Sequence, residues 1–386
     1  MTEQRKIPKY QCVLLWAIYA VVNCFFLYKY VPRAGVSGWV AIGVWAVVAA
    51  VLITLAVALQ NRFSDKVYKS ITIAMLAVMV GMIAVALLKI DPLSVRVDRW
   101  SATTYFLEAL LRGEYPYGVH THVSEMNYPS PLPCWHYINL PFLLLGDVGW
   151  QLAFFLLLLS VAIYWFTGSA FKTFLVVLCL LLSPAYWWEV AVRSDGLSNM
   201  ILVFCLILLL EKKHISFEHG WGWLLCVCAV VATTRLSAII PLAIYLFKPF
   251  LKAGWKQQIM FVLLLAVAIA LIFAPYVFWD TNTWIFFSRN PFMSETSTGS
   301  GWVLLIFVVL GITTAIRYKT FLSYATWTGV LLFTFMLTSL IVIYFTTTPR
   351  VPFTENPNFD ISYLTLSMPF VIFSLACYEN KQRNTK

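Results

Sequence analysis

Residues 70–90 read SITIAMLAVMVGMIAVALLKI, an apolar run whose single charge, Lys89, lies next to its end. A helix of about 20 apolar residues crosses the roughly 30 Å of hydrocarbon in a membrane. Runs of this kind recur through the chain, in which 61% of the residues are hydrophobic and only 11% are charged. An ordinary soluble domain has about 25% charged residues, so the composition excludes a soluble enzyme.

These runs predict an all-α polytopic membrane protein with about 12 membrane segments. They lie near residues 11–28, 36–59, 70–90, 140–166, 173–188, 197–210, 258–278, 302–316, 322–345 and 361–378, with a pair within 221–247. No small-residue cleavage site follows the first run, so we interpret it as a span and not as a signal peptide. The predicted parts are two N-terminal spans in residues 1–69, a central module in 70–301 with a large loop at 91–139, and C-terminal spans in 302–386.

The net charge of +10 is spread over short clusters between the apolar runs, which indicates membrane topology and no nucleic-acid partner. Lysine and arginine collect in the short loops, so these loops and both termini are predicted to be cytoplasmic and the loop at 91–139 to lie outside. Lys29 and Arg33 oppose this assignment. The chain has no Asn-x-Ser/Thr sequon, which favours a bacterial inner membrane.

The topology requires residues 221–247 to enter the membrane and return, although 27 residues are too few for two full spans. Two half-length helices that meet near Thr233, Thr234 and Arg235 satisfy this requirement. Non-helical backbone at that depth is tolerated only where it lines a polar cavity. The cytoplasmic loops are too short for a nucleotide site, so an enzymatic site is predicted to face outward.

The outer loop begins with Asp91-Pro92 and contains Asp98, immediately before a predicted amphipathic helix at 100–112 that lies along the membrane and ends at Gly113. Trp100, Leu107 and Leu111 give this helix an apolar face. Asp98 has two interpretations: it caps the helix, or it acts as a general base at the membrane interface.

Aromatic residues, prolines and histidines fill the rest of this loop. Tyr117, His122 and Tyr128 suit the lining of a sugar or lipid-headgroup site, and equally the internal packing of the loop. His120, His122, Glu125 and His136 contain the donor types that bind a divalent metal, but their spacing is not that of a metal motif. We therefore expect no metal and no other cofactor.

A second acidic cluster, Glu189-x-x-x-Arg193-x-Asp195, lies at an outer junction between two spans. Glu189 and Arg193 are four residues apart and suit an ion pair on one helix, while Ser194 or Asp195 suits a cap of the next helix. The alternative is that the cluster forms another wall of the site in the outer loop.

Arg235 lies within an apolar stretch, where an arginine is costly unless it contacts water or an anion. It either extends to the membrane surface or binds a lipid-linked phosphate through its guanidinium group. Arg289 and Arg350 lie in predicted outer loops and suit either a phosphate or anionic lipid headgroups.

Several features follow one another along the chain in an order that resembles the GT-C superfamily. They are an acidic residue after an early span, an interfacial helix, Gly-Glu-Tyr-Pro-Tyr (113–117), Tyr-Pro-Ser-Pro-Leu-Pro (128–133), an acidic turn and a broken helix pair. These are membrane glycosyltransferases that use polyprenyl-phosphate sugars, and the likeness is to bacterial mannosyltransferase-like members over residues 70–301. It implies that Asp98 matches the catalytic acidic position, Asp195 the second acidic motif, and Arg235 a phosphate-binding position. The paired acidic residues of the family are reduced here to Asp98 between Arg96 and Arg99, which suit phosphate contacts.

The resemblance implies inverting transfer of a hexose, such as mannose, from a polyprenyl phosphate to a hydroxyl of a glycan, glycolipid or protein, in contact with membrane lipids. A phosphate leaving group needs a base for the acceptor and cations for the phosphate, roles that suit Asp98 and Arg235 with Arg289 or Arg350. The alternatives are a transporter or flippase for a lipid-linked sugar, and a non-catalytic assembly subunit.

Overall fold

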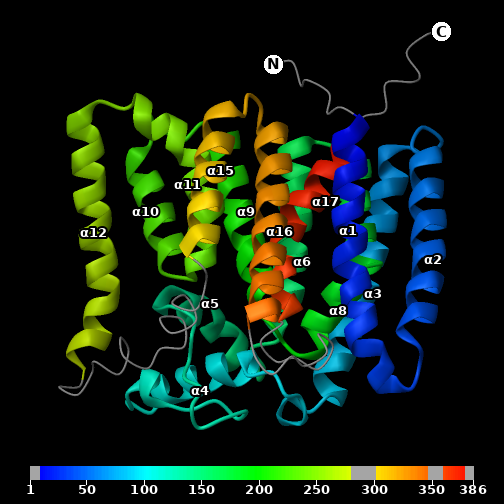
Figure 1. The fold of residues 1–386 in the computed structure, drawn as a ribbon, viewed down its shortest axis with the longest axis horizontal. Coiled ribbons are helices and arrows are strands. Elements are labelled where there is room, and N and C mark those ends of the chain that lie inside the picture. The colour runs from blue at the N-terminus through cyan, green and yellow to red at the C-terminus, as the bar shows by residue number, and fades with distance from the viewer. Residues whose placement is uncertain (1–8, 280–300, 347–359, 379–386) are drawn as a thin grey trace. The chain divides into compact units, whose positions relative to one another are not determined.

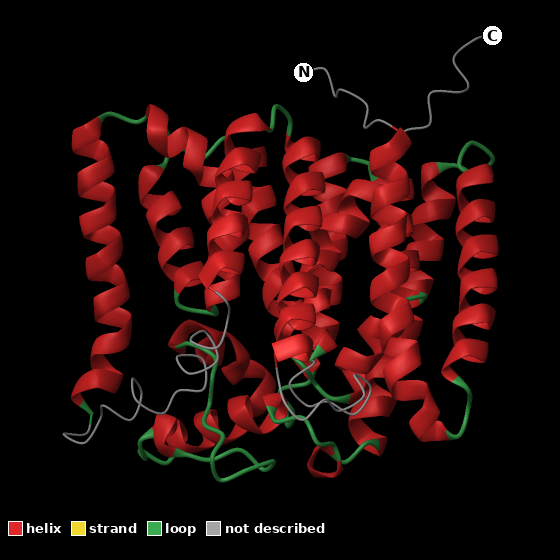
Figure 2. Cartoon of the chain, viewed as in Figure 1, coloured by secondary structure: helices red, strands yellow, loops and turns green. Residues whose placement is uncertain are grey.

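The computed structural model describes residues 9–279, 301–346 and 360–378. Every regular element among these residues is a helix (Figure 2). Six of the helices are long and apolar enough to cross a membrane, or seven if one bent pair counts as a single span. The chain is therefore a helical, multi-pass membrane protein.

The chain divides into two compact units. Unit 1 contains residues 1–79, 157–188 and 302–386, and unit 2 contains residues 80–156 and 189–301. The predicted central module of residues 70–301 therefore contributes to both units.

In unit 1, helix α17 is almost completely buried and packs against α1, α7 and α16. Its close packing with α16 depends on Gly329, where a Cβ atom would lie 3.1 Å from Val371 and 3.2 Å from Phe370. The helices of unit 1 are α1 (Lys9–Tyr30), η1 (Val31–Ala34), α2 (Gly38–Ala58), α7 (Ala170–Leu181), α15 (Gly301–Arg317), α16 (Phe321–Thr346), η4 (Ile361–Ser367) and α17 (Met368–Ala376), with parts of α3 (Asp65–Lys89), α6 (Trp150–Thr167) and α8 (Pro184–Ala191).

Helices α7 and α8 form the bent pair, with an angle of 64° between them. Pro184 has no backbone N–H and disfavours helical backbone at the preceding residue, so the chain bends there. The freed carbonyl of Leu181 accepts a hydrogen bond of 2.8 Å from the indole of Trp187, and that of Leu182 accepts one of 2.7 Å from Trp45. Two indole N–H groups thus supply the hydrogen bonds that these carbonyls lack where the helix is interrupted in unit 1.

Lys29 opposed the predicted orientation, and its surroundings in unit 1 explain why it is tolerated. Its side chain is buried at the end of α1 and interacts electrostatically with Asp360, at the start of η4. Arg33 lies over the ring of Tyr30 at 4.8 Å. Both cations therefore have partners within unit 1 that account for their positions.

Unit 2 contains four successive helices within residues 196–278 and a further set of helices within residues 92–144. Helix α9 packs against α10 and α11, and α10 packs against α11 and α12. Figure 1 shows α4 lying across the direction of α12, and α5 packs against both of them. The helices of unit 2 are η2 (Pro92–Ser94), α4 (Arg99–Leu111), η3 (Pro116–Gly118), α5 (Pro133–Leu144), α9 (Gly196–Lys212), α10 (Trp221–Ala232), α11 (Leu236–Lys252) and α12 (Trp255–Phe278), with the remaining parts of α3, α6 and α8.

The predicted break between two short helices is confirmed, because α10 ends at Ala232 and α11 begins at Leu236. The carbonyls of Thr233 and Thr234 accept hydrogen bonds of 3.0 and 2.9 Å from the backbone N–H groups of Cys134 and Leu132. The loop that leads into α5 and the start of α5 therefore supply hydrogen bonds to the carbonyl groups at the break.

The apolar run predicted at 140–166 is wrong as a single helix. It contains the end of α5 and all of α6 except its last residue, separated by Gly146 with φ of +103° and by Asp147. A left-handed backbone conformation at glycine ends the first helix, and the charged residue begins the turn to the second.

The predicted outer-loop helix is confirmed as α4, but its apolar pattern is not one-sided. Thr103, Thr104 and Phe106 are buried together with Leu107, whereas Leu111 is 59% exposed. Residues on more than one side of α4 are buried because both η3 and α5 pack against this helix.

The close packing at Gly329 generates a prediction about stability. Replacing Gly329 with Leu forces side-chain atoms into the backbone and side chains of α17, which we expect to cost about 1–3 kcal/mol. The measurement is the melting temperature of the purified protein in detergent. Gly43→Leu is the matched control, since a Cβ atom at Gly43 has no neighbour within 4 Å. Equal melting temperatures for the two variants would contradict the packing argument.

Candidate functional site

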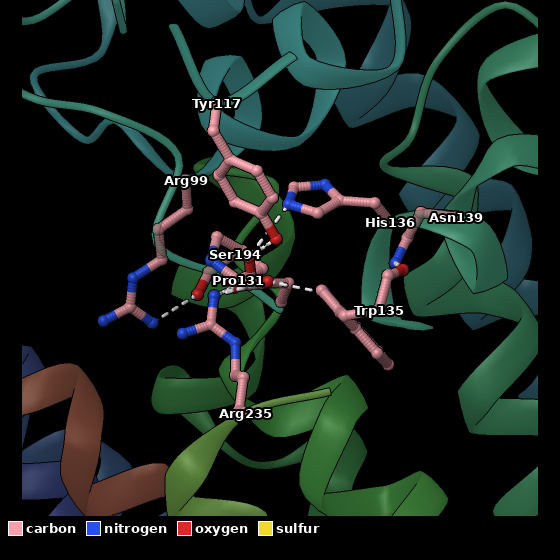
Figure 3. A network of polar contacts seen from close by, with 9 residues as sticks. Arg99, Tyr117, Pro131, Trp135, His136, Asn139, Ser194 and Arg235 are labelled. Carbon is pink, nitrogen blue, oxygen red and sulfur yellow. Dashed lines mark hydrogen bonds and ion pairs between the residues drawn. The ribbon is translucent and has the colours of Figure 1, made fainter. Parts of the chain in front are cut away.

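The carboxylate of Asp195 accepts hydrogen bonds from Arg235 and Trp135 in a buried polar network of unit 2. Figure 3 shows how Arg235, Trp135 and Ser194 lie in this network. Asp195 is 1% exposed and precedes the first residue of α9, but its side chain makes no capping hydrogen bond. Instead, Arg235 Nη2 lies 2.5 Å from both carboxylate oxygens, and Trp135 Nε1 donates to Oδ2 at 2.6 Å. The side chain thus joins the start of α9 to the α10–α11 break and to α5, and the capping interpretation is wrong.

A second guanidinium group comes from the outer loop. Arg99 Nη1 donates to Ser194 Oγ at 2.8 Å, and in Figure 3 Arg99 and Arg235 extend toward Ser194 from different segments. Two arginines and one carboxylate leave one net positive charge at this position. Such a group of side chains is suited to an anion, because guanidinium groups bind phosphate and carboxylate oxygens in pairs.

The Asp195 carboxyl stays ionised in these surroundings. Burial by itself would raise its pKa, but the charge and hydrogen bonds of Arg235, the charge of Arg99 and the indole of Trp135 outweigh burial and hold the pKa below its ordinary value. A carboxylate with a lowered pKa is a poor proton acceptor near neutral pH. Its effect is to fix the position of Arg235.

Asp98 lies next to Arg99 in the chain and is half-buried. It occupies the cap position of α4, yet its carboxylate makes no capping hydrogen bond and accepts one of 3.2 Å from Asn127 Nδ2. Its backbone carbonyl accepts a hydrogen bond from Ser101 Oγ. The interpretation of Asp98 as a simple helix cap is therefore wrong, because its carboxylate binds the Asn127 amide instead of the N-terminus of α4.

His122 connects the outer loop to the start of α4. Its Nδ1 lies 2.6 Å from Ser101 Oγ, and its Nε2 donates to the Val95 carbonyl at 2.9 Å. Tyr128 is half-buried and its ring lies 4.6 Å from that of the exposed His120. The predicted site residues His122 and Tyr128 thus lie in the same loop as Asp98.

Tyr117 and His136 belong to a packed core beside the network. Tyr117 is 2% exposed, and its hydroxyl donates to the Pro131 carbonyl at 3.1 Å, as does His136 Nε2. The ring of His136 is stacked on that of Phe106 at 3.6 Å. Burial lowers the pKa of His136 to about 3, so this histidine is neutral.

Arg193 is held by contacts to Asp147 and to two backbone carbonyls of unit 2. It is 1% exposed, has a left-handed φ of +51°, and its Nε donates to Asp147 Oδ2 at 2.7 Å. Its Nη2 donates to the carbonyls of Leu87 and Ile90 at 2.8 and 2.9 Å. The ion pair of Arg193 is therefore with Asp147, while Glu189 is fully buried at the end of α8.

The remaining predicted residues lie apart from this network or outside the described ranges. Arg96 is exposed. Arg289 and Arg350 lie outside the described residues. Among the residues that the structure describes, no three His, Cys, Asp or Glu side chains form a group that could hold a metal ion.

Two residues of the site were missed from the sequence, and so was the partner of Arg193. Trp135 and Asn127 donate to the two aspartates, and Asp147 pairs with Arg193. Asp147 interrupts an apolar run, which was a usable signal for a turn. Nothing in the local sequence distinguishes Trp135 among the 16 tryptophans or indicates a partner 60 residues away.

No protein-family model matches the chain, and neither a curated protein nor a solved structure is similar to it. The resemblance to the GT-C superfamily stays a prediction.

The Asp147–Arg193 pair predicts a large stability effect. Asp147→Asn leaves the buried Arg193 charge without its carboxylate, which we expect to cost about 3–5 kcal/mol. The measurement is the melting temperature in detergent. The control is Glu114→Gln, which removes the pair of the exposed Glu114 and Arg112 at 2.9 Å and should leave the melting temperature unchanged. A melting temperature of Asp147→Asn equal to that of wild type would refute the assigned role.

The buried neutral His136 predicts a loss of stability in acid. Its pKa is about 3 in the folded chain and about 6.5 when unfolded, so the unfolded chain binds more protons between these values. Stability from this group therefore decreases as the pH falls below about 6.5, by about 2 kcal/mol at pH 5. We expect unfolding at pH 7.5 and pH 5 to differ more for wild type than for His136→Gln. An equal pH dependence in the two proteins would contradict the prediction.

Proposed function

We propose that the protein is a membrane glycosyltransferase that moves a sugar from a polyprenyl-phosphate donor to an acceptor hydroxyl. The observation that carries the proposal is the meeting of Arg99 and Arg235 at the buried Ser194–Asp195 turn, with the carboxylate of Asp98 one residue from Arg99. An anion site and a separate carboxylate are the two parts that this reaction requires.

The chemistry is a direct displacement at the anomeric carbon of the sugar. The bond from this carbon to the phosphate oxygen breaks, and its electron pair stays with the phosphate. A bond to the acceptor oxygen forms on the opposite face, which inverts the configuration. Asp98 takes the proton of the acceptor hydroxyl, while Arg99 and Arg235 stabilise the departing phosphate.

The two aspartates have different roles in this proposal. Asp195 is ionised and bound by Arg235, so it positions the phosphate site and does not accept a proton. Asp98 accepts one hydrogen bond, from the Asn127 amide, which leaves carboxylate lone pairs for an acceptor hydroxyl. Arg289 and Arg350 remain proposed further contacts of the phosphate, and His122 and Tyr128 of the sugar.

The proposed setting is a bacterial inner membrane, with about 12 membrane segments, both termini cytoplasmic and the site outside. Packing within unit 2 supports one part of this topology. Arg193, in the turn before α9, donates to carbonyls at the end of α3, and the start of α5 contacts both Asp195 and the α10–α11 break. The alternation of spans assigns these same positions to the outer side.

A transporter or flippase for a lipid-linked sugar is the second candidate, and the α10–α11 break is the observation that favours it. Transporters use unwound backbone to coordinate substrate. Here, however, the carbonyls of Thr233 and Thr234 already accept hydrogen bonds from the loop before α5. This use of the break favours a fixed site in the outer loop.

The test is transfer of label from a panel of polyprenyl-phosphate sugars in membranes that contain the protein. We expect Asp98→Asn to lower the rate at least 100-fold, because removal of a general base costs about 10²–10⁴ in rate. Asp91→Asn is the matched control, since Asp91 is an exposed aspartate of the same loop that caps η2.

The control should transfer at the wild-type rate. Full transfer by Asp98→Asn would assign the base elsewhere. No transfer from any donor by wild type, together with labelled lipid crossing the bilayer, would replace the transferase by the flippase.

A further inference from the structure

We infer that Trp135 is a positioning residue of the anion site: its indole N–H holds Asp195 so that Asp195 presents Arg235 to the phosphate of the donor. The inference rests on the proposed function for the identity of the ligand. It concerns a residue that does not touch the reacting atoms and acts through two others.

The first observation is the hydrogen bond from Trp135 Nε1 to Asp195 Oδ2, at 2.6 Å. Trp135 and Asp195 are 0% and 1% exposed, so no water competes for this contact. The same oxygen accepts a hydrogen bond from Arg235. A change in the position of Asp195 therefore changes the position of the guanidinium group.

The second observation is that the segment around Trp135 also binds the backbone that carries Arg235. The N–H groups of Leu132 and Cys134 donate to the carbonyls of Thr234 and Thr233, directly before Arg235. The start of α5 thus contacts Asp195 through an indole, and the two residues that precede Arg235 through the backbone. This double contact fixes the relative position of a side chain from α9 and one from the α10–α11 break.

The indole is itself held in place by packing. Its ring is stacked on Phe155 with centroids 5.7 Å apart and an angle of 24°. Phenylalanine at position 135 keeps an aromatic ring in this stack and removes only the N–H. Trp135→Phe therefore separates the hydrogen bond from the packing.

The test measures binding of a short prenyl phosphate, farnesyl phosphate, to the purified protein in detergent, with farnesol as the probe without phosphate. We expect Trp135→Phe to weaken binding of farnesyl phosphate about tenfold and to leave binding of farnesol unchanged. Trp187→Phe is the matched control, because it also loses an indole hydrogen bond, a half-buried one of 2.8 Å to the Leu181 carbonyl within unit 1. It should bind both probes as wild type does.

A double-mutant cycle distinguishes positioning from general stability. If Trp135 acts through Asp195, Trp135→Phe should have no further effect on binding of farnesyl phosphate in an Asp195→Asn background. If Asp195→Asn does not fold, Arg235→Lys takes its place in the cycle, because the effect passes through Arg235 as well. An additive effect of Trp135→Phe, or an equal effect of Trp187→Phe, would overturn the inference.

The proposed transferase function and the positioning role of Trp135 are tested independently of each other. Farnesyl phosphate binding does not require sugar transfer, so the cycle tests the role of Trp135 even if wild type transfers no sugar. Conversely, wild-type transfer with an unchanged affinity of Trp135→Phe for farnesyl phosphate would retain the transferase and remove the positioning role.

Discussion

The ion pair between Arg235 and Asp195 is the interaction on which the rest of unit 2 depends. Removing two charges from water is costly, and their attraction compensates only when the geometry is good and further hydrogen bonds are present. Here the carboxylate has both, with Arg235 at 2.5 Å and the indole of Trp135 at 2.6 Å. Apolar residues of similar volume would stabilise a buried contact as well or better, so stability alone does not explain the pair.

Hydrogen bonds to the carbonyl groups that the helix breaks leave free connect this site to the membrane segments. Each of the two broken helix pairs leaves carbonyl groups that have no partner in their own helix. In unit 1 the carbonyls of Leu181 and Leu182 accept from two indoles, and in unit 2 those of Thr233 and Thr234 accept from backbone N–H groups. The second solution attaches the outer loop to the α10–α11 break, and it thereby brings α5 to the ion pair.

In the turn before α9, three consecutive residues make contacts with different parts of unit 2. Arg193 adopts a left-handed conformation and extends to Asp147 and the end of α3. The next two residues, Ser194 and Asp195, face the guanidinium groups of Arg99 and Arg235. Adjacent residues of one turn thus join it to the end of α3 and to two guanidinium groups from other segments.

The sequence by itself determined the helical membrane class, the break at Thr233–Arg235 and the helix that follows Asp98, because apolar run length and helix-ending residues are local properties. It also indicated Asp98, Asp195 and Arg235 as candidates, since charges next to apolar spans are costly without a partner. It did not determine which charges pair: Arg193 suited Glu189 four residues away, but binds Asp147. Only the tertiary structure decided that Trp135 and Arg235 meet at Asp195, because these contacts join residues 60 and 40 positions apart and depend on how separate helices pack.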